Sequence, residues 1–162
     1  MKEYRVVGRQ ADKEDAPLYM LTVFAKNHVI AKTKFFGAMS KINKIKRTKA
    51  EIVSVEELKE QKVLRARTYG VWIRINSNNN PKNIYKEFRE TSRVKAAEKC
   101  FQSLAALYKK QYYDIDIVAM SEIGDEDIKR EEIKQFAVDG VRFPNIFSTE
   151  KPIRNGLKMK KI

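Results

Sequence analysis

The feature that most constrains this chain is a pattern that occurs twice, with the second copy displaced by 65 residues and aligned without a gap. Identical residues recur from one end of the pattern to the other: Tyr4 and Tyr69, Val6 and Val71, Val29 and Val94, Ala31 and Ala96, Lys34 and Lys99, Phe36 and Phe101, Lys44 and Lys109, Ile52 and Ile117, Val53 and Val118. A long internal repeat indicates two units with the same order of elements. We therefore predict two structurally similar halves.

Each half is predicted to run strand–strand–helix–strand. In the first half, alternating apolar residues around Tyr4 and Val6 predict one strand, and Leu18–Phe24 predicts a second. The second strand is apolar on both faces, which favours a central position in a sheet. A third strand is expected at Glu51–Val55, followed by a polar, acidic connection at Glu56–Gln61.

The second half repeats this order. Its strands are expected at Leu64–Ile75, Asn83–Glu90 and Tyr112–Ile123. Asn27 and Ser92 are residue types that cap helices, so each predicts the start of the helix of its half. An apolar stripe at helical spacing follows each cap: Ala31, Phe35, Met39 and Ile42, then Ala96, Cys100, Leu104 and Leu107.

These patterns predict an α+β fold of two tandem units with a C-terminal extension. We expect the first unit at residues 1–61, the second at 62–124, a strap packing on both at 125–147, and a basic tail at 148–162. Asp125 is expected to open a short helix in the strap. Lysines on the outer faces of both helices, Lys34 and Lys41 among them, are expected to point to solvent or to a ligand.

The chain carries a net charge of +13, which favours a polyanionic partner because such an excess repels itself in a compact protein. Five positive charges lie within Lys41–Lys49, and no acid interrupts them. Phosphate contact is favoured for this run over a solvated helix end, since the helix dipole accounts for one or two cations, not five. Structured RNA is favoured over duplex DNA because the sequence contains no helix-turn-helix or zinc-finger pattern.

Other classes of function find no support in the sequence. It has one histidine, one cysteine and no phosphate-binding glycine loop or metal-ligand motif, so we expect no enzyme, no cofactor and no metal site. Cys100 falls on the apolar helix stripe, where a thiol is inert packing. No apolar run approaches the roughly 18–20 residues of a membrane span. Trp72, which lies among arginines, is either a base-stacking residue or part of a core or subunit contact.

Six segments together resemble the eukaryotic large-subunit ribosomal protein family named L-eighteen-A, or e-L-twenty in the unified naming. They occur in the order and spacing of that family: Glu3–Arg9, Phe24–Lys32, Tyr69–Arg74, Asn83–Arg89, Ile133–Phe136 and Val141–Pro144. The resemblance implies a non-catalytic structural constituent of cytoplasmic ribosomes, assembled in the nucleolus. It implies large-subunit rRNA and neighbouring ribosomal proteins as partners, and neither a membrane nor a small-molecule substrate. The chain departs from the family in its short, lysine-rich C-terminus.

The resemblance implies rRNA contacts at Arg5, Arg9, Lys26, Asn27, His28, Lys32, Arg74 and Arg142. Charge and predicted placement add further candidates: Lys34, Lys41, Lys44, Lys46, Arg47, Lys49, Arg65, Arg67, Lys95, Lys99, Arg154, Lys158, Lys160 and Lys161. A second hypothesis also fits these residues, namely a free-standing RNA-binding adaptor or ribosome assembly factor. A structural constituent is present once per large subunit, whereas such a factor associates transiently and below that ratio.

Overall fold

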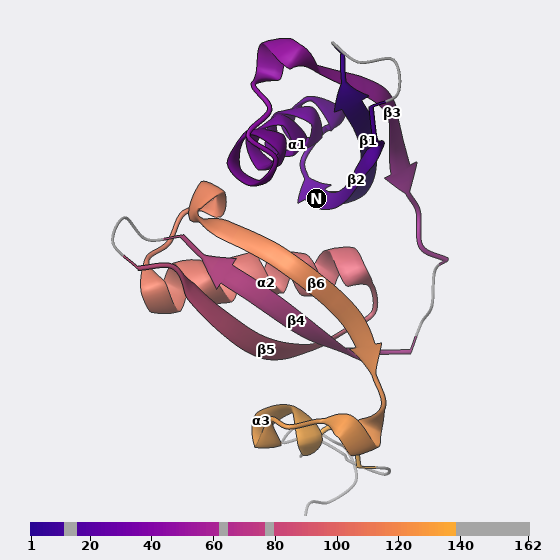
Figure 1. Ribbon diagram of the computed structural model, residues 1–162. Helices are drawn as coiled ribbons and strands as arrows, with labels where there is room; N and C mark the ends of the chain where they lie inside the picture. Colours follow the sequence, from indigo (N-terminus) through magenta and orange to yellow (C-terminus); the bar gives the residue numbers. More distant parts are fainter. Residues whose placement is uncertain (12–15, 62–64, 77–79, 139–162) are drawn as a thin grey trace, which may run out of the picture.

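Two three-stranded antiparallel sheets, each packed against one long helix, form the body of this computed structural model (Figure 1). The structure describes residues 1–11, 16–61, 65–76 and 80–138. The predicted α+β class is confirmed. Within these residues, no helix is both long enough and apolar enough to cross a membrane.

The first sheet has the order β2-β1-β3, with β1 at Lys2–Gln10, β2 at Tyr19–Ala25 and β3 at Ala50–Leu58. The prediction that the second strand is central is therefore wrong, since β1 holds that place. On the outer side of β2, Met20 is 66% exposed, as is Leu18 (65%) just before the strand, whereas Phe24 at its end is buried against the second unit. Apolar residues on both faces thus do not require a central strand.

The third strand is longer than predicted and absorbs part of the expected acidic connection. Glu56 and Glu57 lie in β3, where their carboxylates meet Arg5 Nη1 at 4.0 Å and Lys2 Nζ at 2.8 Å. Opposite charges on neighbouring strands favour pairing, so these acids extend the ladder instead of ending it.

The second sheet has the order β5-β4-β6, with β4 at Arg67–Ile75, β5 at Lys82–Glu90 and β6 at Ile115–Ile123. The last strand starts later than predicted because Tyr112–Asp114 forms a 3-10 turn, η2. At the start of that turn, the Gln111 side chain and the Asp114 carboxylate satisfy backbone N–H groups. Leu64, the first residue of the predicted Leu64–Ile75 strand, lies outside the described residues.

Both helices begin at the predicted caps. Asn27 Oδ1 accepts the Ile30 N–H at 2.9 Å and starts α1, His28–Ile42. Ser92 Oγ accepts the Lys95 N–H at 3.3 Å and starts α2, Arg93–Tyr108. A cap of this kind satisfies a backbone donor that has no partner inside the helix.

The apolar stripes of the helices are confirmed except at their last members. Ile42 and Leu107 are 75% and 66% exposed, because they follow the fully buried Met39 and Leu104 at the ends of their helices. The first core contains Tyr4, Val6, Ala25, Ala31, Phe35 and Met39. The second contains Phe24, Tyr69, Val71, Ile73, Ile75, Phe88, Ala96, Ala97, Cys100, Phe101, Leu104 and Ile115.

The two units are joined by contacts as well as by the chain. Phe24, from the end of β2, packs in the core of the second unit, and its carbonyl accepts the Tyr112 hydroxyl. The N-terminal ammonium meets Glu98 Oε1 at 2.5 Å. A groove of about 550 Å³ lies between the units, with Glu3 and Arg93 in its walls.

After β6 the chain forms a short 3-10 turn, η3, at Asp125–Asp127, and then α3 at Glu131–Lys134. Where the sequence predicts a short helix opening at Asp125, the structure has a three-residue 3-10 turn. In Figure 1 this segment lies on the side of the second sheet that faces away from the first unit. Glu87 of β5 holds it by accepting the Lys129 and Arg130 N–H groups at 3.1 and 2.9 Å. The remaining strap and the basic tail, residues 139–162, lie outside the described residues.

Candidate nucleic-acid interface

Five lysines of the first unit gather along α1 and its two ends. No acidic residue occurs between Lys26 and Ala50, and the apolar stripe of α1 turns toward the sheet, so the lysines lie on other faces of the helix. Within the described residues, none of the five makes an ion pair. We call them the α1 band: Lys26, Lys32, Lys41, Lys44 and Lys46.

The C-terminal end of α1 fixes the last three lysines of the band. Lys44 has a φ of 60°, a left-handed conformation that ends the helix, and the Ile45 N–H then donates to Met39 O at 3.2 Å. The Ile45 side chain packs against the first core. Of these three lysines, only Lys41 lies in the last turn of the helix, where a positive charge is stabilised by the helix dipole. The dipole does not account for Lys44 and Lys46, which favours a ligand as the reason for their charge.

Arg47 and Lys49 follow the band in the 3-10 turn η1, Arg47–Lys49. Both are exposed. The Arg47 guanidinium lies 5.3 Å from the centroid of the Phe36 ring, which holds it against the helix while leaving its N–H donors available.

The prediction that Lys34 points to solvent or to a ligand is wrong, because this lysine turns toward the second unit. Its ammonium lies 3.9 Å from the Tyr112 ring centroid and 5.5 Å from that of Phe101, both in the second unit. Burial lowers the pKa of Lys34, and the Asp116 carboxylate opposes that shift. This lysine therefore joins the two units.

Arg5 and Arg9 lie apart from the band. They alternate along β1 with the buried residues Tyr4 and Val6, so they face the side of the sheet opposite α1. They also have carboxylate neighbours, since Arg5 Nη1 meets Glu56 at 4.0 Å and Arg9 Nε meets Glu51 at 3.3 Å.

Asn27 and His28 stand at the start of α1 beside Lys26, and both are exposed. The Asn27 side-chain oxygen is engaged as the helix cap. Its amide nitrogen remains the group that an RNA acceptor would meet.

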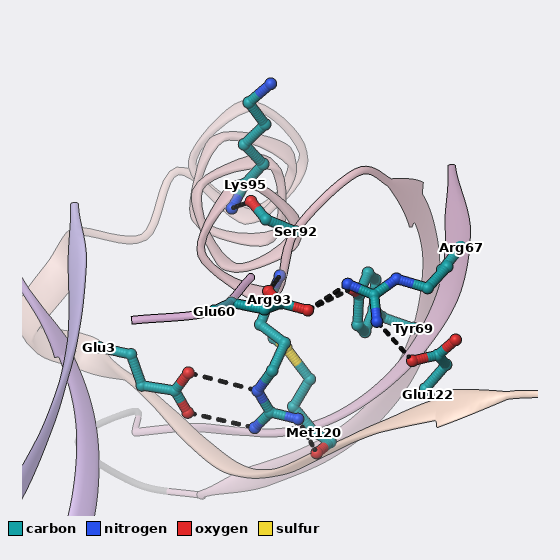
Figure 2. Close-up of polar contacts among 9 residues, drawn as sticks. All are labelled: Glu3, Glu60, Arg67, Tyr69, Ser92, Arg93, Lys95, Met120 and Glu122. Carbon is teal, nitrogen blue, oxygen red and sulfur yellow. Dashed lines mark hydrogen bonds and ion pairs between the residues drawn. The ribbon is translucent and has the colours of Figure 1, made fainter. Parts of the chain in front are cut away.

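Arg67 was also a candidate for RNA contact, but its guanidinium already pairs with two carboxylates of the protein (Figure 2). It pairs with Glu60, and its Nη1 donates to Glu122 at 2.9 Å, while its Nε is buried without an acceptor. Burial alone would raise the pKa of Glu60, but the Arg93 N–H and the Arg67 guanidinium outweigh it and hold that pKa below its ordinary value. Arg67 therefore fixes the start of β4.

The residue that sequence reasoning missed is Arg93, the first residue of α2. Figure 2 shows its guanidinium facing the Glu3 carboxylate, with donor–acceptor distances of 3.2 and 3.3 Å. Its Nη1 also donates to Met120 O at 3.1 Å, and its backbone N–H donates to Glu60 at 2.9 Å. Glu3 is 6% exposed, so this pair links the two units through a buried carboxylate at the wall of the groove.

The remaining candidates of the second unit do not form one surface. Lys99 pairs with Glu90 at 2.8 Å, whereas Arg65, Arg74 and Lys95 are exposed at separate places on β4, α2 and the approach to β4. The structure thus does not bring these cations together with the α1 band. Five candidates lie outside the described residues: Arg142, Arg154, Lys158, Lys160 and Lys161.

The described residues offer little for catalysis. They contain no cluster of three or more histidine, cysteine, aspartate or glutamate side chains placed to hold a metal ion. Burial raises the pKa of Cys100 to about 12, against a smaller opposite effect of Lys86, so the thiol is not a nucleophile near neutral pH.

Comparisons with known proteins point to one family. The model of the ribosomal proteins 50S-L18Ae/60S-L20/60S-L18A matches residues 1–120. Large ribosomal subunit protein eL20A of Schizosaccharomyces pombe is 37% identical over 148 residues, which cover 89% of this chain and 84% of the relative. The eL20 proteins of Candida albicans and Drosophila melanogaster are 36% and 30% identical, each over 89% of this chain and over 86% and 83% of the relative. These matches show that the chain belongs to this family of large-subunit ribosomal proteins.

Proposed function

We propose that this protein is a structural constituent of the large ribosomal subunit that braces rRNA mainly through the α1 band. The observation that carries the proposal is a set of five lysines on a helix and connection that contain no acid, and none of the five forms an ion pair with the part of the chain that the structure describes. Members of the family are structural, so no enzymatic role is assigned to the chain.

The physics of phosphate recognition supports this choice of surface. Lysines that neutralise phosphates release condensed counterions, which favours binding without any catalytic geometry. The band is also held by ordered backbone, from the Asn27 cap to Lys44, so little ordering entropy is lost on contact. Arg47, Lys49 and His28 flank the band at the two ends of α1, whereas Arg5 and Arg9 would meet a different part of the RNA.

We infer that the two units are repeated halves, at residues 1–61 and 62–124. Several equivalent features lie 65 positions apart, including the starts of β1 and β4, of α1 and α2, and of β3 and β6. The ladder irregularities between Val7 and Gly8 and between Trp72 and Ile73 keep the same offset. So do the left-handed lysines Lys44 and Lys109.

The family supports a proposal about the location and partners of the protein. We place the protein in cytosolic ribosomes, in contact with rRNA and with neighbouring large-subunit proteins, after assembly in the nucleolus. Residues 148–162 hold five basic residues and one acid, and we propose that this tail adds contacts to RNA.

The test is the copy number of the tagged chain on gradient-purified large subunits. One copy per subunit, released only by high salt, is expected for a structural constituent. A substoichiometric amount confined to precursor particles would favour the alternative, an RNA-binding assembly factor. A pool that remains free of ribosomes at every salt concentration would contradict both.

A further inference from the structure

Two aromatic rings lie side by side on the outer face of the second sheet. Trp72 of β4 and Tyr85 of β5 are register partners, and their ring centroids are 5.0 Å apart with an interplanar angle of 51°. The neighbouring residues Val71 and Ile73 face the core. Trp72 therefore faces away from α2, where it stays 44% exposed.

The Tyr85 ring is held from several sides. Its hydroxyl donates to Glu87 at 2.8 Å, and the Lys129 ammonium lies 5.8 Å from its ring centroid. The Arg130 guanidinium donates to the Tyr85 carbonyl at 3.0 Å. Because Tyr85 is fixed, Trp72 rests on an ordered neighbour and its exposed ring face is already arranged for a flat partner.

Polar groups suited to a nucleotide stand on the same face. Arg74 is two residues beyond Trp72 on β4, is exposed, and makes no ion pair within the described residues. Its register partner on β5 is Asn83, also exposed, whose amide both donates and accepts hydrogen bonds. The nearby carboxylate of Asp116 accepts from Asn76 Nδ2 at 2.5 Å, so it already has a donor.

The equivalent place in the first unit lacks this character. Val7 and Met20, each 65 positions before Trp72 and Tyr85, are also register partners, but they are aliphatic and offer no ring. Tryptophan, tyrosine and arginine are also enriched in protein–protein interfaces, so a protein neighbour is the alternative that the experiment below tests. A sheet face with exposed aromatic rings and flanking arginine is the arrangement that stacks unpaired RNA bases.

We propose that Trp72 stacks on an unpaired nucleobase of RNA, with Arg74 at the adjoining phosphate. The proposal rests on the proposed RNA-binding function and assigns base contact to a surface other than the α1 band. Such stacking contributes about a 5- to 100-fold change in affinity per base.

Trp72 is the sole tryptophan of the chain, so its fluorescence reports on this site alone. The experiment titrates the full chain with a short single-stranded oligoadenylate and, separately, with polyphosphate of equal charge. Oligoadenylate is expected to quench the emission, because a stacked base contacts the indole, and polyphosphate is expected to leave it unchanged. Equal quenching by both polyanions would overturn the proposal.

Variants give a second readout by anisotropy of labelled oligoadenylate. Trp72→Leu is expected to lower the affinity about 5-fold or more, while Trp72→Phe retains most of it. Tyr113→Leu is the matched control, since Tyr113 is 69% exposed in η2, outside the aromatic pair. Binding without quenching and without loss in Trp72→Leu would overturn the stacking proposal and leave RNA contact to the α1 band. Absence of any RNA binding would contradict the proposed function itself.

Discussion

The two units share an order of elements but use their cations differently. In the first unit, the lysines of the α1 band have no carboxylate partner among the described residues, and the stretch that carries them has no acid. In the second unit, Arg67, Arg93 and Lys99 meet Glu60, Glu3 and Glu90. The α1 band thus leaves positive charge for a partner, whereas these three cations of the second unit are used for internal cohesion.

The cores of the two units also differ, because only the second includes a side chain from the other unit. The second core receives Phe24 from the first unit, and Tyr112 of the second unit donates to the Phe24 carbonyl. We infer that the second unit acts as the anchor to which the first is fastened. Mutations of cations should therefore separate into two classes, those that reduce stability and those that reduce RNA binding.

The largest stability effect is expected for Arg93→Met. This change leaves Glu3, 6% exposed, as an unpaired charge at the junction, which costs about 3 kcal/mol. Urea unfolding measures the loss. Lys99→Met is the control, because its pair with Glu90 is more exposed and contributes at most about 1 kcal/mol. Equal losses in the two variants would contradict a special role for the Glu3–Arg93 pair.

A smaller effect of opposite sign is expected for Lys44→Gly and Lys109→Gly. Both lysines have positive φ, at 60° and 50°, and glycine adopts that conformation without steric cost. Each change should raise the free energy of unfolding by about 1 kcal/mol. Lys44→Gly should also weaken RNA binding, while Lys109→Gly should not. If both weaken binding equally, the assignment of the main RNA contact to the α1 band is wrong.

The smallest effect is the pH dependence contributed by Glu60. Because the folded protein holds its pKa below the ordinary value of 4.5, its stabilising contribution is present above that value. It is lost as the pH falls below 4.5 and through the folded pKa. Glu60→Gln should flatten the fall in stability across this acid range, as measured by urea unfolding at each pH. An unchanged slope would place the acid sensitivity elsewhere.

Local patterns predicted much of the fold. The caps at Asn27 and Ser92 and the buried positions Phe35 and Leu104 follow from side-chain chemistry and helical spacing within a short segment. Such features need no knowledge of the rest of the chain. Strand order was not accessible in the same way, since β2 is as apolar as a central strand and still lies at an edge.

The candidate site was predicted only in part, for a related reason. The lysines of the α1 band lie in a stretch of sequence that contains no acidic residue, so charge alone identifies them. Lys34 looks like a member of that run, yet it packs on Tyr112 because the two units meet there. Arg93 gave no signal, since its partner Glu3 is 90 residues away and becomes buried only when the units dock.

The most direct test compares the salt dependence of rRNA binding for two variants with equal loss of charge. One replaces Lys32, Lys41, Lys44 and Lys46 by glutamine, and the other replaces Lys82, Lys95, Lys109 and Lys110. The slope of log K against log salt should fall by roughly 3 to 4 in the first and much less in the second, with both proteins folded. An equal fall in both variants, or a larger fall in the second, would contradict the claim that the α1 band carries the contact.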